Sequence, residues 1–568
     1  MSTQPWIASY PQDLAWDAPL EHGGKSVPDL FDEAVAKWPG RPAYDFLGKK
    51  ATYAQLADYI ERATRGFQDL GVGPGVHVGL YLPNCPHYLI AFFAILKAGG
   101  TVVNYSPLDA ERELEHKIED SRTDIIVTLD LATLYPRIAD MLDKTRLRKL
   151  IIGNLPEALP FPKSIFFPLA KRKEIAKIPH DNKHIPFSKL LAPSDPPDPV
   201  TIDNPADTVA VLQYTGGTTG LPKAAMLTHG NLVAATTQVN NWSESLLENG
   251  SERILGVLPL FHVYALTGVM LAGLAAGSEI ILHPRFDVDM VLTDIQKKRL
   301  TVFPGVPTMY TAINNHPDLG RYDLSSLKVC VSGGAPLPAE VQKTFQDTTG
   351  CRLVEGYGLT ESSPTGATNP LDGRSRNGSV GLPLQHTTID IVDVDDPSRV
   401  LGIGDVGEIC ISGPQIMKGY WNRPEETTSA LHAGRLHTGD IGYMDEDGFV
   451  YIVDRKKDMI LSGGFNVYPR TIEDAIYEHD AVAECIVVGV PDDYRGEAAK
   501  AFVKLKAGAP VLTLEVLRDF LADKLGRHEL PAALEIRASL PRTSVGKFSK
   551  TELIEAERRK QTQEQANA

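Results

Sequence analysis

The sequence is short of cysteine and of positive charge. Its 568 residues include five cysteines, which are dispersed and never form a C-x-x-C pair: Cys85, Cys330, Cys351, Cys410 and Cys485. An odd, scattered set argues against a zinc site and a disulfide framework, and predicts reduced thiols in a cytoplasmic protein. The net charge is −15 at pH 7. Because non-specific nucleic-acid binding rests on an excess of Lys and Arg, we expect no nucleic-acid partner.

Signal and membrane-spanning segments are also scarce. The amino-terminal residues include Asp, Trp and Pro and lack the basic and then apolar pattern of a signal segment. One uncharged run, residues 257–277, is nominally long enough to cross a bilayer. Pro259 and His262 interrupt this run, and three glycines lower its apolar side-chain content: Gly268, Gly273 and Gly277. We therefore predict a buried helix that lines an apolar cavity.

The first two-thirds of the chain alternates strand-like and helical patterns. Such interleaving predicts an α/β fold, in which largely parallel sheets carry helices on both faces. The predicted helices span residues 54–70, ending at Gly71, 86–97 and 288–298, and the predicted strands span 76–82, 124–129, 209–214, 279–282 and 327–332.

The chain is too long for one compact core, and its pattern of strand-like and helical segments changes twice. From about residue 379, short β-type runs between Gly, Pro and Asp clusters predict a small β-rich subdomain over 379–454. Beyond it, two helical patterns and one strand pattern predict a separate α+β domain. We therefore expect an N-terminal domain over 1–454 and a C-terminal domain over 455–568.

Residues 155–199 interrupt the alternation, since they are rich in proline and locally basic. Two interpretations stay open: a solvated surface excursion, or a patch that touches an anionic membrane, where apolar substrates reside. The basic residues are Lys163, Lys171, Arg172, Lys173 and Lys177, and Phe161, Phe166 and Phe167 lie among them.

The most informative stretch is 214–223, Tyr-Thr-Gly-Gly-Thr-Thr-Gly-Leu-Pro-Lys, between an apolar run and a helical segment. Backbone amides free of bulky side chains, threonine hydroxyls and one ammonium group suit a polyphosphate. The spacing is not that of the P-loop, because Leu221 and Pro222 precede the lysine. The loop predicts a nucleoside triphosphate site outside the P-loop class, with a flexible turn as the alternative.

Five further segments have a similar character. Residues 332–337, Ser-Gly-Gly-Ala-Pro-Leu, follow an apolar strand, and ligand crevices of open α/β sheets lie at the carboxyl ends of strands. Residues 356–361 offer an aromatic ring, a hydroxyl and a carboxylate, and 437–440 offer an acid suited to a ribose diol. Residues 454–468 combine charges with a glycine pair, and 541–547 place a lysine after a glycine.

In this order and spacing, the segments resemble the adenylate-forming superfamily of acyl-CoA synthetases, peptide-synthetase adenylation domains and luciferases. The resemblance extends over roughly residues 30–555, and 258–262, 355–361 and 454–469 are most similar to bacterial fatty-acyl-CoA ligases. It implies an ATP-dependent acyl-CoA ligase for medium- or long-chain fatty acids. The ligands would be the carboxylic acid, ATP, Mg²⁺ and coenzyme A, and the C-terminal domain would be a mobile lid. A homodimer is left open.

The resemblance also implies roles for individual residues. Glu361, with Thr215, would hold Mg²⁺, Thr360 would touch the α-phosphate, and His262 would lie near the acyl carboxylate. Lys547 would neutralise the carboxylate and α-phosphate oxygens, and Lys457 would be the hinge of the lid. The remaining ligand contacts would be Thr215, Gly216, Gly217, Thr218, Thr219, Gly220 and Lys223 for the β- and γ-phosphates, Gly334, Ala335, Pro336 and Tyr357 for adenine, Asp440 and Arg455 for ribose, and Gly463 and Gly464 for the CoA thiol arm.

Each role has a plainer alternative. His262 would be a satisfied core histidine, Tyr357 core packing, Glu361 a local cap, Lys547 a solvated lysine and 455–457 a charged linker. At the level of function, the alternatives are a dicarboxylate–CoA ligase, an adenylation enzyme that passes acyl-AMP to a carrier protein, and a non-catalytic nucleotide-binding protein. The presence of both Glu361 and Lys547 argues against the last.

Overall fold

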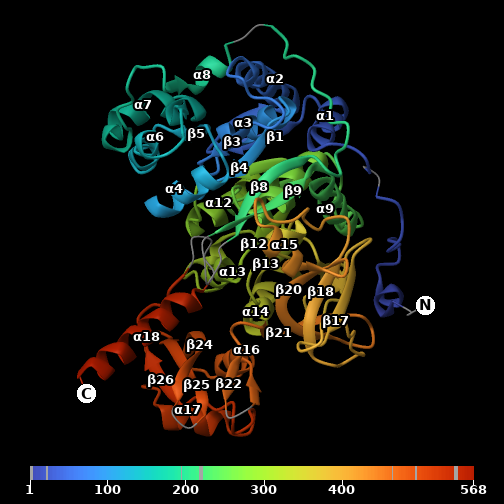
Figure 1. Cartoon of the computed structure of the whole chain (residues 1–568), viewed down its shortest axis with the longest axis vertical. Coiled ribbons are helices and arrows are strands. Elements are labelled where there is room, and N and C mark those ends of the chain that lie inside the picture. The colour runs from blue at the N-terminus through green and yellow to red at the C-terminus, as the bar shows by residue number, and fades with distance from the viewer. Residues whose placement is uncertain are drawn as a thin grey trace.

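The computed structural model places two large sheets above a smaller C-terminal part (Figure 1). In the described residues the strands form four sheets. The structure describes residues 4–20, 23–192, 195–215, 222–462, 465–492, 495–542 and 548–567.

The first sheet has the strand order β7-β6-β5-β3-β4-β8-β9. Its strands are parallel except for the antiparallel β8–β9 hairpin. Their bounds are β3 His77–Leu80, β4 Thr101–Asn104, β5 Ile125–Leu129, β6 Lys149–Gly153, β7 His184–Pro186, β8 Val209–Thr215 and β9 Lys223–Thr228.

The second sheet has the order β16-β15-β14-β13-β12-β10-β11-β1-β2. Its central strands, from β14 to β1, are parallel, and antiparallel strands close both edges. The bounds are β1 Pro42–Phe46, β2 Lys49–Thr52, β10 Arg253–Gly256, β11 Glu279–Leu282, β12 Val302–Gly305, β13 Val329–Gly333, β14 Arg352–Tyr357, β15 Ala367–Thr368 and β16 Leu382–Pro383.

Helices fill the space between the two large sheets. Helix α2 (Tyr53–Asp69) contacts β1 and β2 of the second sheet, and α3 (Pro86–Lys97) contacts α2 as well as β3 and β4 of the first. Residues 86–96 of α3 are all buried, as expected for a helix that is apolar on nearly every side. The predicted α/β fold is thus confirmed.

The other helices cover the outer faces and join the sheets. Helices α12, α13 and α14 pack in sequence, and α14 contacts β14. The α-helices are α1 Val27–Lys37, α4 Glu111–Asp120, α5 Tyr135–Ala139, α6 Met141–Lys144, α7 Lys163–Ala170, α8 Phe187–Leu190, α9 His229–Ser243, α10 Val263–Ala265, α11 Ala272–Ala275, α12 Val288–Lys298, α13 Pro307–Asn314, α14 Ala339–Thr349 and α15 Pro424–Ala430. The short turns are the 3-10 helices η1 Pro5–Ser9, η2 Leu155–Ala158, η3 Arg172–Glu174, η5 Leu319–Arg321 and η6 Thr360–Ser362, and the π-helix η4 Leu266–Leu271.

Two smaller sheets complete the chain. An antiparallel sheet contains β17 Thr388–Val392, β18 Gly407–Ser412, β19 Leu431–His432, β20 Arg435–Met444 and β21 Val450–Arg455. The C-terminal part, red in Figure 1, has its own sheet and core. Its elements are β22 Ile460–Ser462, β23 Phe465–Val467, α16 Pro469–Tyr477, β24 Val482–Asp492, β25 Gly496–Leu505, α17 Leu514–Leu521, β26 Ala533–Ile536 and α18 Lys550–Asn567.

The predicted bounds of helices and strands agree best with the structure where the local sequence pattern is strong. Helices α3 and α12 and strand β11 have the predicted bounds, and α2 ends before Gly71, whose φ is +85°. Strand β9, however, was missed. Lys-Ala-Ala-Met-Leu-Thr is a weak strand former by itself, and its conformation depends on pairing with β8.

Two ambiguous segments are also resolved. Residues 263–275 form the buried series α10, η4 and α11. Within the described part of the chain, no helix combines the length and the apolarity needed to cross a membrane. Residues 155–199 are only partly a surface excursion, since β7 extends the first sheet beside β6 and Phe187 and Leu190 of α8 are buried.

A buried amide ties the end of β10 to α3. Asn84, which is 2% exposed, donates from Nδ2 to the carbonyls of Gly256 at 3.0 Å and Leu258 at 2.8 Å. Its Oδ1 accepts the Leu260 N–H at 2.8 Å. One side chain therefore bonds three backbone groups of the 256–260 segment, where buried polar groups need partners. The Gly256 carbonyl also accepts the His283 N–H at 3.0 Å.

A second set of polar groups holds the same segment from the first sheet. The Tyr88 hydroxyl lies 2.8 Å from the Leu260 carbonyl and 2.9 Å from Asn104 Oδ1. Asn104 donates to Gln213 Oε1 at 2.9 Å, and Gln213 Nε2 donates to the Phe261 carbonyl at 3.0 Å. Because Asn104 lies on β4 and Gln213 on β8, the network fixes the 256–261 segment relative to the first sheet.

We predict that Asn84→Ala destabilises the protein by about 3 kcal/mol, because the Leu258 carbonyl and the Leu260 N–H both lose their Asn84 partner. The measurement is the urea dependence of tryptophan fluorescence, with Asn314→Ala as the control. The Asn314 amide donates one bond, to the Val341 carbonyl at 3.0 Å, and its loss should cost about 1 kcal/mol. Equal destabilisation by the two variants would contradict the special position of Asn84.

Candidate active site

The predicted site segments gather at the carboxyl ends of parallel strands. The 257–262 segment follows β10, Val306 follows β12, and Gly334 follows β13. Tyr357 ends β14, and the hairpin loop follows β8 of the first sheet. The expected placement of the small residues after 332 at a strand's carboxyl end is confirmed, and this edge is where open α/β sheets bind ligands.

The described base of the phosphate-type loop is a β-hairpin. Thr215 pairs with Lys223 across the β8–β9 ladder, and its hydroxyl donates to the Lys223 carbonyl at 3.4 Å. Tyr214 anchors the end of β8 by donating to Asp120 Oδ2 at 2.8 Å. The predicted residues Gly216, Gly217, Thr218, Thr219 and Gly220 lie outside the described residues.

The segment 417–421 joins this hairpin to the predicted magnesium carboxylate. On the hairpin side, Met226 donates to the Gly419 carbonyl and Trp421 to the Ala224 carbonyl, each at 2.8 Å. On the other side, the Met417 N–H donates to the Glu361 carbonyl at 2.8 Å. The 417–421 segment therefore sets the position of Glu361 relative to β9.

Tyr420 makes the corresponding side-chain connection. Its hydroxyl donates to Glu361 Oε1 at 2.6 Å, and Lys223 Nζ lies 4.9 Å from the centre of its ring. Burial, followed by the charge of Glu361, raises the pKa of Tyr420, so the hydroxyl keeps the proton it donates. Glu361 is thus partnered across the site and is not merely a local cap.

Sequence reasoning missed Tyr420. A Gly-Tyr-Trp triplet carries no chemical signature of its own, and the hydroxyl acquires its role only by meeting a carboxylate 59 residues away. The one available signal was an aromatic residue between a glycine and a tryptophan, which is also ordinary core composition.

A second cluster centres on a buried carboxylate. Asp440 on β20 is 3% exposed, and it pairs with Arg455 of β21 in the strand register. The Arg455 Nε lies 3.0 Å from Asp440 Oδ1, and the Tyr357 hydroxyl donates to Oδ2 at 2.6 Å. The negative charge of Asp440 raises the pKa of Arg455. The carboxylate is therefore fixed on both sides and able to accept hydroxyl donors.

Tyr357 both packs in the core and takes part in the second cluster. Its half-buried ring packs against the core of the small antiparallel sheet, and its hydroxyl holds Asp440. The adenine contact expected of this ring stays a prediction.

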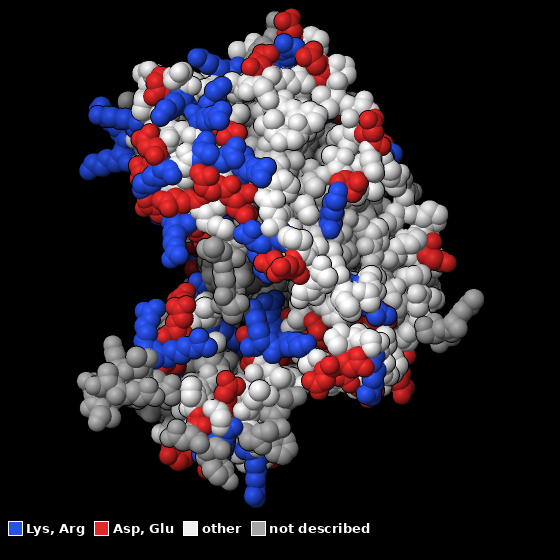
Figure 2. Space-filling model, in the orientation of Figure 1, with Lys and Arg blue, Asp and Glu red and all other residues white. Residues whose placement is uncertain are grey.

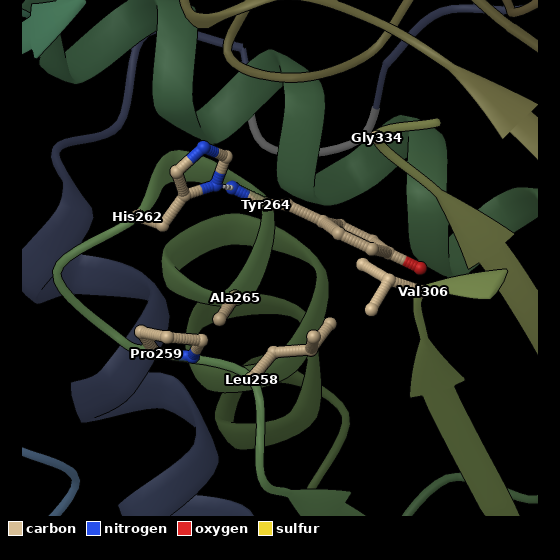
Figure 3. Close-up of a pocket in the computed structure, with 7 residues that line it drawn as sticks. All are labelled: Leu258, Pro259, His262, Tyr264, Ala265, Val306 and Gly334. Atoms are coloured by element: carbon tan, nitrogen blue, oxygen red, sulfur yellow. Dashed lines mark hydrogen bonds between the residues drawn. The ribbon is translucent and has the colours of Figure 1, made fainter. Parts of the chain in front are cut away.

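An apolar pocket lies beside these clusters (Figure 3). His262 is half-buried at its rim, and its Nδ1 accepts the Tyr264 N–H at 3.4 Å. The Tyr264 hydroxyl donates to the Val331 carbonyl at 2.9 Å, which fixes this ring as one wall of the pocket. His262 thus lies at a cavity and not in the packed core. The lining residues are Leu258, Pro259, His262, Tyr264, Ala265, Val306 and Gly334.

The other predicted residues are distributed around these three clusters. Thr360 begins η6, one residue before Glu361, and Ala335 and Pro336 follow Gly334 before α14. Lys457 is exposed in the turn between β21 and β22. Gly463, Gly464 and Lys547 lie outside the described residues.

Asp454 connects the C-terminal part to the strand that carries Arg455. This buried carboxylate accepts the Arg455 N–H at 2.7 Å and, from α16, the Arg470 N–H at 2.8 Å. It therefore caps the first turn of α16, where helix N–H groups lack partners within the helix. Lys550 of α18 lies 3.9 Å from the same carboxylate.

Comparison with known proteins identifies the family of the chain. Residues 31–421 match the family described as AMP-binding enzyme, and residues 471–547 match the AMP-binding enzyme C-terminal domain. The chain belongs to the AMP-binding enzyme family. The resemblance drawn from the motifs is confirmed.

Relatives of this AMP-binding enzyme match it from end to end. It is 42% identical to a long-chain-fatty-acid–CoA ligase of Bacillus subtilis and 38% identical to one of Escherichia coli O157:H7, with 98% of both chains covered in each case. Among solved structures, ATP-bound MatB from Rhodopseudomonas palustris has a TM-score of 0.82 at 29% identity, covering 94% of this chain and 99% of that chain.

We predict that Asp440→Asn weakens AMP binding about tenfold, because a neutral amide is a poorer acceptor and loses the charge that pairs with Arg455. Isothermal titration calorimetry with AMP measures the change. Asp390→Asn is the matched control, since Asp390 lies in the same sheet and pairs with Arg435 at 2.7 Å. Unchanged AMP affinity in Asp440→Asn would remove Asp440 from the nucleotide site.

Proposed function

We propose that this AMP-binding enzyme is an ATP-dependent acyl-CoA ligase that acts on medium- or long-chain fatty acids. Its products are acyl-CoA, AMP and pyrophosphate, and acyl-AMP is the intermediate. The observation that carries the proposal is a chain of two contacts: Lys223 lies over the Tyr420 ring, and the Tyr420 hydroxyl bonds Glu361. Glu361 follows β14 in the same turn that begins at Tyr357. That chain of contacts joins a phosphate-type loop to a nucleoside-type cluster. The names of the relatives support the class of acid.

In the first step, an oxygen of the fatty-acid carboxylate attacks the α-phosphorus of ATP, and the bond to pyrophosphate breaks. Thr215 and Lys223 would hold the leaving pyrophosphate at the base of the hairpin, and Thr360 would contact the α-phosphate. Negative charge accumulates on the phosphate oxygens in such reactions, so positioned cations and N–H donors supply most of the catalysis.

The residues fit a magnesium ion. Glu361 and Thr215 present oxygen ligands, which Mg²⁺ prefers, and the Tyr420 bond engages only Oε1 of the Glu361 carboxylate. When bound, the ion would neutralise phosphate charge. Tyr420 keeps the carboxylate oriented toward the β8–β9 hairpin.

At the nucleoside end, Asp440 would accept the ribose hydroxyls while Arg455 and Tyr357 hold its carboxylate in place. Gly334, Ala335 and Pro336 would line the adenine. The absence of a side chain on Gly334, whose φ is +80°, allows a close approach of the base to the backbone.

In the second step, the sulfur of CoA attacks the acyl carbon, the bond to AMP breaks and the thiol proton is released. We propose that Lys547 acts in the first step and that the lid then rotates about Lys457 to bring Gly463 and Gly464 to the thiol arm. The division into 1–454 and 455–568 is part of this proposal, and the separate C-terminal core supports it.

The acid would enter beside His262. Apart from His262 and Tyr264, the lining residues of the pocket carry apolar side chains or none, which favours a hydrocarbon tail over a second carboxylate. The test is pyrophosphate release with mono- and dicarboxylic acids of graded length, and AMP release with CoA or with an acyl-carrier protein. Long monocarboxylic acids and CoA should give the fastest turnover. No acid-dependent pyrophosphate release across the panel would overturn the proposal.

We predict that Lys547→Ala abolishes most acyl-AMP formation, because the charge that neutralises the reacting oxygens is lost. Supplied acyl-AMP should still transfer to CoA at nearly the normal rate. Both half-reactions are measured separately by chromatography, with the exposed Lys506→Ala as control. Equal losses in the two half-reactions would contradict this division of roles.

We predict that Tyr420→Phe raises the Mg²⁺ concentration needed for half-maximal pyrophosphate release by about fivefold, the effect of one lost hydrogen bond to a charged group. The ring that faces Lys223 is retained, so the rate at saturating Mg²⁺ should change less. Tyr443→Phe is the control, since that ring stacks on Tyr451 at 4.9 Å. An unchanged Mg²⁺ requirement would show that the hydroxyl does not position Glu361.

A further inference from the structure

Three large apolar side chains project from the region of α7. Phe161 is 81% exposed, Ile165 57% and Phe166 61%. They lie within six residues of one another, so the exposed apolar side chains are concentrated in one short stretch of the chain. Phe167, the next residue, packs partly buried against the main core and so fixes which side of α7 faces outward.

The same stretch is strongly basic in an acidic protein. Between 161 and 177 the chain has five basic side chains and one acidic side chain, whereas its net charge is −15. Figure 2 shows Lys and Arg side chains, with some acidic ones among them, gathered at the upper left, where Figure 1 places α7. The exposed basic residues are Lys163, Lys171, Arg172, Lys173 and Lys177.

This region is anchored to the first sheet. Ala176 donates to the Asp130 carbonyl at 2.7 Å, and Ala132 donates to the Glu174 carbonyl at 2.8 Å. Both bonds join the residues after α7 to the end of β5. The exposed cluster therefore sits on a fixed part of the fold, and its exposure is not that of an unattached loop.

We propose that Phe161, Ile165, Phe166 and the five basic residues, together the α7 surface, dock the protein on a bilayer that contains anionic phospholipid. The apolar side chains enter the interface, and the basic side chains contact the headgroups. The surface charge selects this occupant, because a second copy of the chain would oppose like charges across a two-fold axis. The proposal deepens the proposed function by placing the enzyme where its apolar acid partitions.

The test uses the full chain and needs no turnover. Co-sedimentation with vesicles of phosphatidylglycerol and phosphatidylcholine should show binding that weakens with added salt, and vesicles of phosphatidylcholine alone should bind much less. Phe161→Ser/Ile165→Ser/Phe166→Ser should lower the partition coefficient at least about tenfold, since it removes the inserted apolar area. Lys171→Glu/Arg172→Glu/Lys173→Glu should do the same through charge.

The control is Val511→Ser/Val516→Ser, which changes apolar residues that are 84% and 49% exposed in the C-terminal part, and its binding should equal that of the unaltered protein. Equal binding to both vesicle types, or undiminished binding by the Ser triple variant, would overturn the proposal. So would analytical ultracentrifugation showing that the α7 surface holds a homodimer. Because binding is measured without ATP or acid, a failure here is distinguishable from a failure of the ligase assignment.

Discussion

The site depends on a buried polar network that holds the 256–261 segment between the two large sheets. Asn84 binds it from the start of α3, and Tyr88 and Gln213 bind it from the side of the first sheet. The proposed acyl pocket begins on that segment, whereas the hairpin proposed to bind phosphates belongs to the first sheet. A hydrophobic interface alone would let the two sheets slide, because apolar packing has little directionality. The amide geometry therefore sets the distance between the apolar pocket and the β8–β9 hairpin.

The turn after β14 couples the two ends of the proposed nucleotide site. Tyr357 holds Asp440, the proposed ribose acceptor, and four residues later Glu361 bonds Tyr420 beside the β8–β9 hairpin. Gly358 makes this turn possible, because a Cβ there would lie 1.6 Å from the Pro364 carbonyl oxygen. Backbone contact this close cannot be relieved by a side-chain rotation. One glycine thus permits the close backbone approach within the turn that carries both Tyr357 and Glu361.

Sequence was sufficient where a short segment carries its own information. Helix α3 is predicted by its continuous apolar pattern, and Glu361 and Asp440 are found because they stand in recognisable motifs. Asn84, Tyr420 and β9 could not be found this way. Asn84 acts on residues more than 170 positions away, Tyr420 on a carboxylate 59 positions away, and β9 forms only beside β8. Their roles are properties of the folded chain and not of any local pattern.

The bond between Asp454 and Arg470 spans the proposed hinge. Lys457 lies between these residues in the chain, so a rotation there must break the bond and uncap α16. Arg470 also acts on Glu355 of β14: burial raises the pKa of Glu355 to about 7, and the positive charge of Arg470 opposes the shift. Rotation would remove that charge from Glu355. The described arrangement is therefore held by contacts that the proposed rotation would have to replace, and the proposed CoA-binding state would need new partners for Asp454 and Glu355.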